Sequence, residues 1–99
     1  MDALQVVAEP RRREILRLVW SDELPASEIA AHFNVSFPAV SQHLSVLRHV
    51  GFVSVRRDGR RRLYRADRKA IGPLRPALEE MWSRSLDRLV TLVEEERKR

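Results

Sequence analysis

The sequence has no cysteine, only three glycines and few aromatic residues. Without a thiol, disulfide bonds, thiolate metal ligands, cysteine nucleophiles and thiol redox sensing are all excluded. No apolar run approaches the roughly 18 residues that a membrane-spanning helix needs. The first residues, Met1-Asp2-Ala3, also lack the basic and then apolar pattern of a secretion signal. We therefore expect a cytoplasmic protein with no membrane partner.

The residue groups of an enzyme are missing as well. The sequence has no nucleophile with a partner base, no Gly-rich phosphate loop and no histidine–carboxylate cluster at a useful spacing. His43 and His49 are six residues apart on one predicted helix, whereas two metal ligands on one helix face need a spacing of about three or four. We expect no enzymatic activity, no cofactor and no metal site. The sequence leaves open whether a small-molecule effector acts on the protein.

A chain of 99 residues fits one domain, which we place over residues 1–99. Hydrophobic residues make up 43% and charged residues 33%, which is ordinary for a folded protein. A domain of this size buries only about two-thirds of its surface, so a partner subunit would add to its stability.

The basic residues are concentrated in one short segment. The net charge is +5, but residues 56–69 alone carry +6, so the other 85 residues sum to −1. A merely solvated surface usually mixes both signs, whereas a one-sided excess on a short element is typical of a surface that binds a polyanion. That polyanion is either nucleic acid or an acidic membrane, and the order of the predicted elements distinguishes the two.

The first half of the chain is predicted to consist of short helices. Residues 3–8 form a short apolar pattern, and Pro10 suits the first turn of a second helix. Residues 21–25 follow as a connector. The next two helices span about residues 26–49 and are separated by a three-residue break at 34–36. Two short helices joined by such a turn are typical of a helix-turn-helix.

The second helix of this motif has one apolar and one polar face. Val40, Leu44 and Leu47 form the apolar face by their i, i+4, i+7 spacing. Small polar residues on the other face let a helix lie deep in the major groove of DNA, where Ser and Gln side chains reach base edges. The DNA-contacting residues predicted from this face are Ser36, which also suits the N-cap, and Phe37, Pro38, Ser41, Gln42, Ser45 and Arg48.

A β-hairpin is predicted over about residues 52–66. Asp58-Gly59 lies between two β-prone runs, and this dipeptide favours a type I′ turn, which needs a positive φ at both central residues. An arginine-rich hairpin directly after a helix-turn-helix is typical of a wing that reaches phosphates or an adjacent minor groove. The predicted DNA contacts are Arg57, Arg60, Arg61 and Arg62. Side chains alternate along a strand, so only some of these arginines can face the DNA.

One long helix is predicted over about residues 74–97. Its apolar stripe is wider than a domain this small can cover alone, and its balanced charges argue against a DNA-binding arm. Part of the stripe belongs to the core, and the excess width predicts the seam of a symmetric dimer. The seam residues predicted on this helix are Leu78, Met81, Trp82, Leu86, Leu89 and Val93.

Two stretches resemble the signatures of a known family. Glu9-Pro10-Arg11-Arg12-Arg13-Glu14-Ile15-Leu16-Arg17-Leu18 resembles its opening "D/E-P-x-R-x-x-I-L-x-L" pattern. Residues 36–48 are similar to its "S-x-x-x-V-S-x-H-L-x-x-L" recognition helix, and Gly51-Phe52-Val53 and the basic wing follow in the family's order. His43 matches the histidine of this pattern, which implies a DNA-contacting or a packing role for it. The sequence is thereby identified as a member of the ArsR-type (arsenic-repressor-like) bacterial winged-helix transcription regulators.

The resemblance covers nearly the whole chain. It implies a mainly α fold with a small β-hairpin, that is, a winged helix-turn-helix with a long C-terminal helix. It implies that the terminal helices form a two-fold dimer interface, which would include Leu4 and Val7. It also implies a sequence-specific regulator of transcription, a repressor that binds an inverted-repeat operator in double-stranded DNA as a homodimer.

The sequence departs from the metal-sensing members of the family. Those members use a Cys-x-Cys pair on the first helix of the helix-turn-helix, or Asp and His ligands on the C-terminal helix. Here the first stretch reads Leu24-Pro25-Ala26-Ser27-Glu28, and the C-terminal helix has no histidine. The sequence therefore resembles a metal-independent branch.

Other readings of particular residues and of the whole chain stay open. Phe37 stands where many relatives carry a polar residue, and its ring either touches a thymine methyl group or folds back onto the domain. The Arg11-Arg12-Arg13 run is interpreted as a solvated helix face with one or two phosphate contacts. A winged-helix module that binds a protein or RNA partner is the alternative function. A membrane binder would carry its cations on an amphipathic helix instead of a hairpin.

Overall fold

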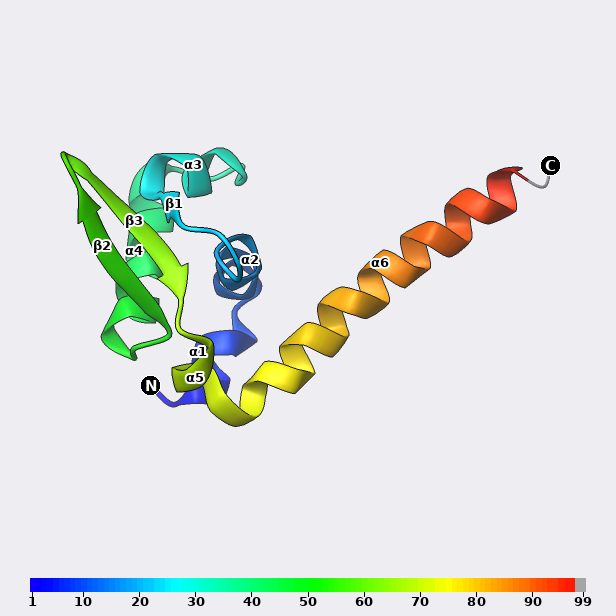
Figure 1. Ribbon diagram of the computed structural model, residues 1–99, viewed down its shortest axis with the longest axis horizontal. Coiled ribbons are helices and arrows are strands. Elements are labelled where there is room, and N and C mark those ends of the chain that lie inside the picture. Colours follow the sequence, from blue (N-terminus) through cyan, green and yellow to red (C-terminus); the bar gives the residue numbers. More distant parts are fainter. Residues whose placement is uncertain (98–99) are drawn as a thin grey trace.

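The computed structural model describes residues 1–97, except for the side chains of residues 85–87. Figure 1 shows a head of short helices and a small sheet, from which the long helix α6 (Arg75–Arg97) projects. This helix accounts for the elongated outline of 50 × 29 × 22 Å. The predicted fold class, mainly helical with a β-hairpin and a long C-terminal helix, is confirmed.

The head is built from nine short elements. In chain order they are α1 (Ala3–Ala8), α2 (Pro10–Leu18), β1 (Leu24–Pro25), α3 (Ala26–Ala31), α4 (Phe37–His49), β2 (Val53–Asp58), β3 (Arg61–Ala66), α5 (Arg68–Ile71) and the 3-10 turn η1 (Gly72–Leu74). Helices this short are marginal in isolation, so tertiary packing stabilises them. Side chains from α1, α2, α3, α4, β2, β3, α5 and α6 accordingly meet in one hydrophobic core.

The sheet has three strands, one more than the sequence predicts. The strand order is β1-β3-β2, and both pairs are antiparallel. β1 is only two residues long and pairs Leu24 with Tyr64 and Pro25 with Leu63. Residues 21–25 were expected to be a connector, because two residues are too few to show an alternating pattern. Pro25 is tolerated because β1 is an edge strand.

The tip of the hairpin differs by one residue from the expected turn. Asp58 pairs directly with Arg61, so the two central residues of the turn are Gly59 and Arg60, not Asp58 and Gly59. Gly59 has φ +64°, and among residues 1–97 no residue other than glycine has a positive φ. A type I′ turn would need positive φ at two residues, whereas a glycine at the first central position is typical of a type II′ turn. The prediction of a type I′ turn was therefore wrong.

The long helix is attached to the head at its first turns. Leu78 is buried in the core, and Trp82 packs partly against it. Trp82 also meets Trp20, which follows α2, in an edge-to-face contact with ring centroids 4.8 Å apart and an interplanar angle of 79°. Beyond this contact, residues 88–97 of α6 are exposed. The head therefore holds only the start of the helix.

Candidate nucleic-acid interface

The second helix of the helix-turn-helix, α4, is fixed on the head by one face. Ser36 is its N-cap, and its hydroxyl accepts a hydrogen bond from the Ala39 backbone N–H at 3.3 Å. Val40, Leu44 and Leu47 are buried in the core, as their spacing predicts. The opposite side of the helix is thereby turned away from the protein.

That opposite side is exposed along its whole length. We call its residues the reading face: Phe37, Pro38, Ser41, Gln42, Ser45 and Arg48, all of which are exposed. Within residues 1–97, the side chains of Ser41 and Gln42 make no hydrogen bond to the protein. Their donors and acceptors are therefore available to a partner. The sequence assigned these six residues to one surface, and the structure places them there.

His43 lies elsewhere. Its Nε2 is 3.8 Å from the Oε2 of Glu9, and only 19% of its side chain is exposed. Position 43 follows the buried Val40 by three residues, which turns it toward the buried face of the helix. The structure therefore places His43 against the start of α2, in the packing role that the sequence left open beside a DNA contact. The contact is an ion pair whenever the imidazole is protonated.

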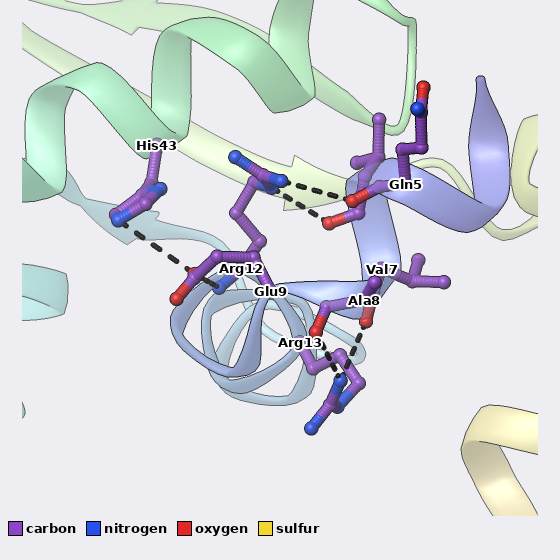
Figure 2. Close-up of polar contacts among 8 residues, drawn as sticks. Gln5, Val7, Ala8, Glu9, Arg12, Arg13 and His43 are labelled. Carbon is purple, nitrogen blue, oxygen red and sulfur yellow. Dashed lines mark hydrogen bonds and ion pairs between the residues drawn. The ribbon is translucent and has the colours of Figure 1, made fainter. Parts of the chain in front are cut away.

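Glu9 also organises the joint between α1 and α2, which Figure 2 shows. It ends α1 and is the N-cap of α2, where its Oε2 accepts from the Arg12 backbone N–H at 3.0 Å. The last four carbonyls of a helix have no partner inside that helix. Here guanidinium groups bind all four, as Arg12 donates to Gln5 and Val6 at 3.1 and 2.7 Å, and Arg13 donates to Val7 and Ala8 at 2.8 and 3.0 Å.

These bonds correct the interpretation of the Arg11-Arg12-Arg13 run. Arg12 and Arg13 are not a solvated face, because their guanidinium groups donate hydrogen bonds to the C-terminal carbonyls of α1. Their positive charge also stabilises the negative end of the α1 helix dipole. Arg11 is exposed and makes no hydrogen bond or ion pair with the described residues. Neighbouring arginines in this run therefore have two different environments.

The two strands of the wing carry their arginines on two different faces. Side chains alternate along a strand, and directly paired residues share a face. The pairs on the inner face, which continues into the core, are Val53 with Ala66, Val55 with Tyr64, and Arg57 with Arg62. The pairs on the outer face are Ser54 with Arg65, Arg56 with Leu63, and Asp58 with Arg61.

The arginines of the outer face are partly neutralised within the chain. Arg56 makes a bidentate pair with Glu23, both bonds measuring 3.1 Å, and Arg61 donates to Asp58 at 3.3 Å. The hydrogen bond from Arg56 lowers the pKa of Glu23 below its ordinary value of 4.5. Glu23 is 33 residues away from Arg56 in sequence, so no local pattern could have revealed this pair.

The inner face of the wing has the opposite character. Arg57 and Arg62 lie directly across from each other, both are exposed, and neither has an ion pair among the residues the structure describes. Like charges at directly opposed positions destabilise a strand pair. Arg60, in the turn beside them, is also exposed and has no anionic partner in the described chain. An anion between these side chains would relieve the repulsion.

The wing and the helix-turn-helix face each other across a shallow hollow of about 330 Å³. Its walls come from the start of α3, the first turns of α4 and the wing. The lining residues are Pro25, Ala26, Ser27, Phe37, Ser41, Arg60, Arg61, Arg62 and Tyr64. The hollow thus brings Phe37 and Ser41 of the reading face together with the wing arginines 60–62 on one side of the head.

The predicted seam residues are distributed over the terminal helices. Val7 and Leu78 are buried within the single chain, and Trp82 is half-buried. Leu4, Met81, Leu89 and Val93 are exposed. The side chain of Leu86 lies outside the described residues. Their contact with a partner chain stays a prediction.

Among the described residues, no three side chains of the His, Asp and Glu types gather in a way that could hold a metal ion. No described helix is both long enough and apolar enough to cross a membrane.

The chain is similar to known regulators over most of its length. It is 37% identical to the HTH-type transcriptional regulator Rv2034 of Mycobacterium tuberculosis over 94 residues, which are 95% of this chain and 88% of that protein. It is 36% identical to the transcriptional repressor SdpR of Bacillus subtilis over 58 residues, 59% of this chain and 64% of that protein.

Solved structures show the same fold. A crystal structure described as a possible transcriptional regulator for arsenical resistance superposes with a TM-score of 0.71 at 45% identity, over 92% of this chain and 95% of that one. A homodimeric winged helix-turn-helix DNA-binding domain from Mycobacterium bovis superposes with a TM-score of 0.69 at 26% identity, over 82% of this chain and 75% of that one.

The family model of bacterial regulatory proteins of the arsR family matches residues 9–55. These residues run from the Glu9 joint through α4 into β2, so they include both signatures on which the sequence resemblance rests. Together with the relative that spans 95% of the chain, this match shows that the protein belongs to the arsR family and is a winged helix-turn-helix regulator of transcription that binds DNA, not an enzyme.

Proposed function

We propose that the protein is a repressor that binds an inverted-repeat operator in double-stranded DNA as a homodimer. The observation that carries this proposal is the hollow between α4 and the wing. On the α4 side Ser41 presents an unbonded hydroxyl, and on the wing side Arg60 and Arg62 carry charge without a counterion among the described residues. Arg57, the direct strand partner of Arg62, adds a further unpaired charge to the wing. The first arrangement suits base edges in the major groove, and the second suits the phosphates beside it.

The dimer is proposed from the course of the apolar stripe along α6. Leu78 and Leu89 are 11 residues apart, as are Trp82 and Val93, and 11 residues make three turns of a helix. The face that packs on the head at Leu78 and Trp82 therefore continues into Leu89 and Val93, which are 59% and 53% exposed. A second copy of the helix would cover them, and the homodimeric relative from Mycobacterium bovis supports this arrangement.

Sedimentation analysis at micromolar concentration tests the dimer. We expect the parent protein to sediment as a dimer and Leu89→Glu to sediment as a monomer, because a charge in the seam would be buried without a partner. A monomeric parent would refute the proposal. In a two-fold dimer the recognition helices lie about 34 Å apart, one turn of DNA, so a footprint should show two inverted half-sites.

Repression and the absence of a metal effector complete the proposal. The relative SdpR is a transcriptional repressor. The sequence of the present chain offers neither a thiol nor a pair of metal ligands on one helix face. Because bacterial chromosomal DNA lies in the cytoplasm, we propose that the protein acts there. Micromolar zinc, nickel, cadmium or arsenite should leave the affinity for the operator unchanged, and a tenfold loss with any of them would contradict this part.

Base reading is tested with the Gln42→Ala and Ser41→Ala variants. Each lost base contact should cost about 1–3 kcal/mol of binding free energy on the operator and little on random DNA. The operator is first isolated by selection from a pool of random duplexes. Ser83→Ala, an exposed serine on α6, is the matched control and should bind like the parent. If both variants weaken random DNA as much as the operator, the reading face does not read bases.

A further inference from the structure

Phe37 is an unusual residue for a DNA-reading helix. Among the described side chains, eight large hydrophobic residues are exposed, and seven of them lie within the first four residues or on α6, the two regions that carry the proposed dimer interface. The eighth is Phe37, which is 52% exposed on the head. More than half of its surface is exposed, and it is not one of the buried residues that form the hydrophobic core. The ring is therefore not buried in the domain, and the core gives no reason for a phenylalanine here.

The position of Phe37 restricts what can cover its ring. It is the first residue of α4, directly after the Ser36 cap. It lines the hollow together with Ser41 of α4, while Tyr64 and Arg60 to Arg62 of the wing line it as well. Residues at the N-terminal end of a recognition helix are the ones that contact base edges. Ser41 follows Phe37 by four residues, so the two side chains lie on one helix face and would meet neighbouring bases.

We propose that Phe37 determines specificity by packing against the 5-methyl group of a thymine in each half-site. This inference rests on the proposed function, because it presupposes that the reading face enters the major groove. The donors and acceptors of the base edges would lose water against a phenyl ring without gaining a hydrogen bond. The methyl group of thymine is the apolar group that the major groove presents. The arginines across the hollow hold the adjacent phosphates and thereby keep the base against the ring.

The test replaces thymine by deoxyuridine, which removes the methyl group and leaves every hydrogen-bonding atom in place. One operator thymine after another is exchanged, and the affinity of the parent and of Phe37→Ala is measured by fluorescence anisotropy. The transfer of one buried methyl group corresponds to about fourfold in affinity. We expect the parent to lose about fourfold at one thymine per half-site and about 15-fold when both half-sites are changed.

The variants separate the methyl contact from other roles of the residue. Phe37→Ala should bind the thymine and the uracil operators equally at that position, whereas Phe37→Leu should keep the preference for thymine. Gln42→Ala is the matched control on the same face, and it should lose affinity while it keeps the preference. Phe37 is exposed, so Phe37→Ala should retain the helical circular dichroism and the unfolding temperature of the parent.

Three outcomes overturn the inference. A parent that tolerates uracil at every position has no methyl contact, and a Phe37→Ala variant that keeps the preference for thymine places that contact elsewhere. In both cases specific binding persists, so the proposed function stands and only the role of Phe37 is wrong. A parent that binds no duplex specifically refutes the proposed function and this inference together.

Discussion

Two arginines of α2 and two arginines of the wing have opposite environments. Arg12 and Arg13 donate to the four terminal carbonyls of α1. Arg57 and Arg62 oppose each other across two strands and have no anionic partner in the described part of the chain. The first two satisfy the backbone of their own protein, and the second two lack a counterion. A basic run in a sequence therefore does not by itself mark a surface that binds nucleic acid.

The comparison also holds within the wing. Arg56 and Arg61 on the outer face have Glu23 and Asp58 as partners, while the inner face, which continues from the core toward the hollow, keeps its charge unbalanced. Surface ion pairs contribute little to stability. Here these ion pairs neutralise Arg56 and Arg61 on the outer face. The unpaired positive charge therefore lies on the inner face and the turn, where it can bind an external anion.

The largest expected effect is on stability, and it concerns Arg12. Replacing it by alanine leaves the carbonyls of Gln5 and Val6 without their charged donor. We expect the free energy of unfolding, measured by urea titration, to fall by about 2 kcal/mol. Arg11→Ala is the matched control, because Arg11 is exposed and unbonded in the described chain, and it should change the free energy by less than about 0.5 kcal/mol. Equal losses in both variants would mean that α1 is not held by these bonds.

The smallest expected effect concerns Glu23 and depends on pH. The pKa of Glu23 is lowered in the folded protein by Arg56, so its contribution to stability is fully present above the ordinary value of 4.5. The contribution is lost as the pH falls through the lower pKa of the folded state. Glu23→Gln should therefore lower Tm by at most a few degrees at pH 7, and the two melting curves should converge in acid. A difference that grows as the pH falls would contradict the pairing.

Much of the architecture was predictable because it depends on local periodicity. The spacing of Val40, Leu44 and Leu47 identified the buried face of α4, and Ser36 identified its start, since both signals lie within a few turns of one helix. The long C-terminal helix followed from the same period. The reading face was then fixed as the complement of the buried face.

The errors arose where one residue or one distant partner decides the structure. The turn at the wing tip lies one residue later than predicted. Its first central residue needs a positive φ, which a glycine adopts without strain, and Gly59 occupies that position. That shift sets which arginines share a face. β1 could not be predicted, because its pairing with Tyr64 and Leu63 joins residues about 40 positions apart.

The two family signatures were recognised in the sequence, but their physical meaning came from the structure. Glu9 of the opening signature lies 3.8 Å from His43 of the recognition-helix signature, and Arg12 of the opening signature caps α1. These motif residues join α1, α2 and α4. They therefore position the reading face. Of the residues that we expect to contact bases, Ser41 matches the recognition-helix signature, while Phe37 and Gln42 stand at positions that the signature leaves unspecified.

The central claim is that the unpaired arginines of the wing, such as Arg62, bind phosphate and that Arg12 and Arg13 of α2 do not. It is tested most directly by the dependence of affinity on salt concentration, measured on one random duplex for the parent, Arg62→Ala and Arg12→Ala below their unfolding temperatures. Each lost phosphate contact reduces the slope of log K against log salt by about 0.9, so Arg62→Ala should flatten it by about 1.8 in a dimer. Arg12→Ala should keep the slope of the parent. A parent-like slope for Arg62→Ala, or an equal flattening for Arg12→Ala, would contradict the account.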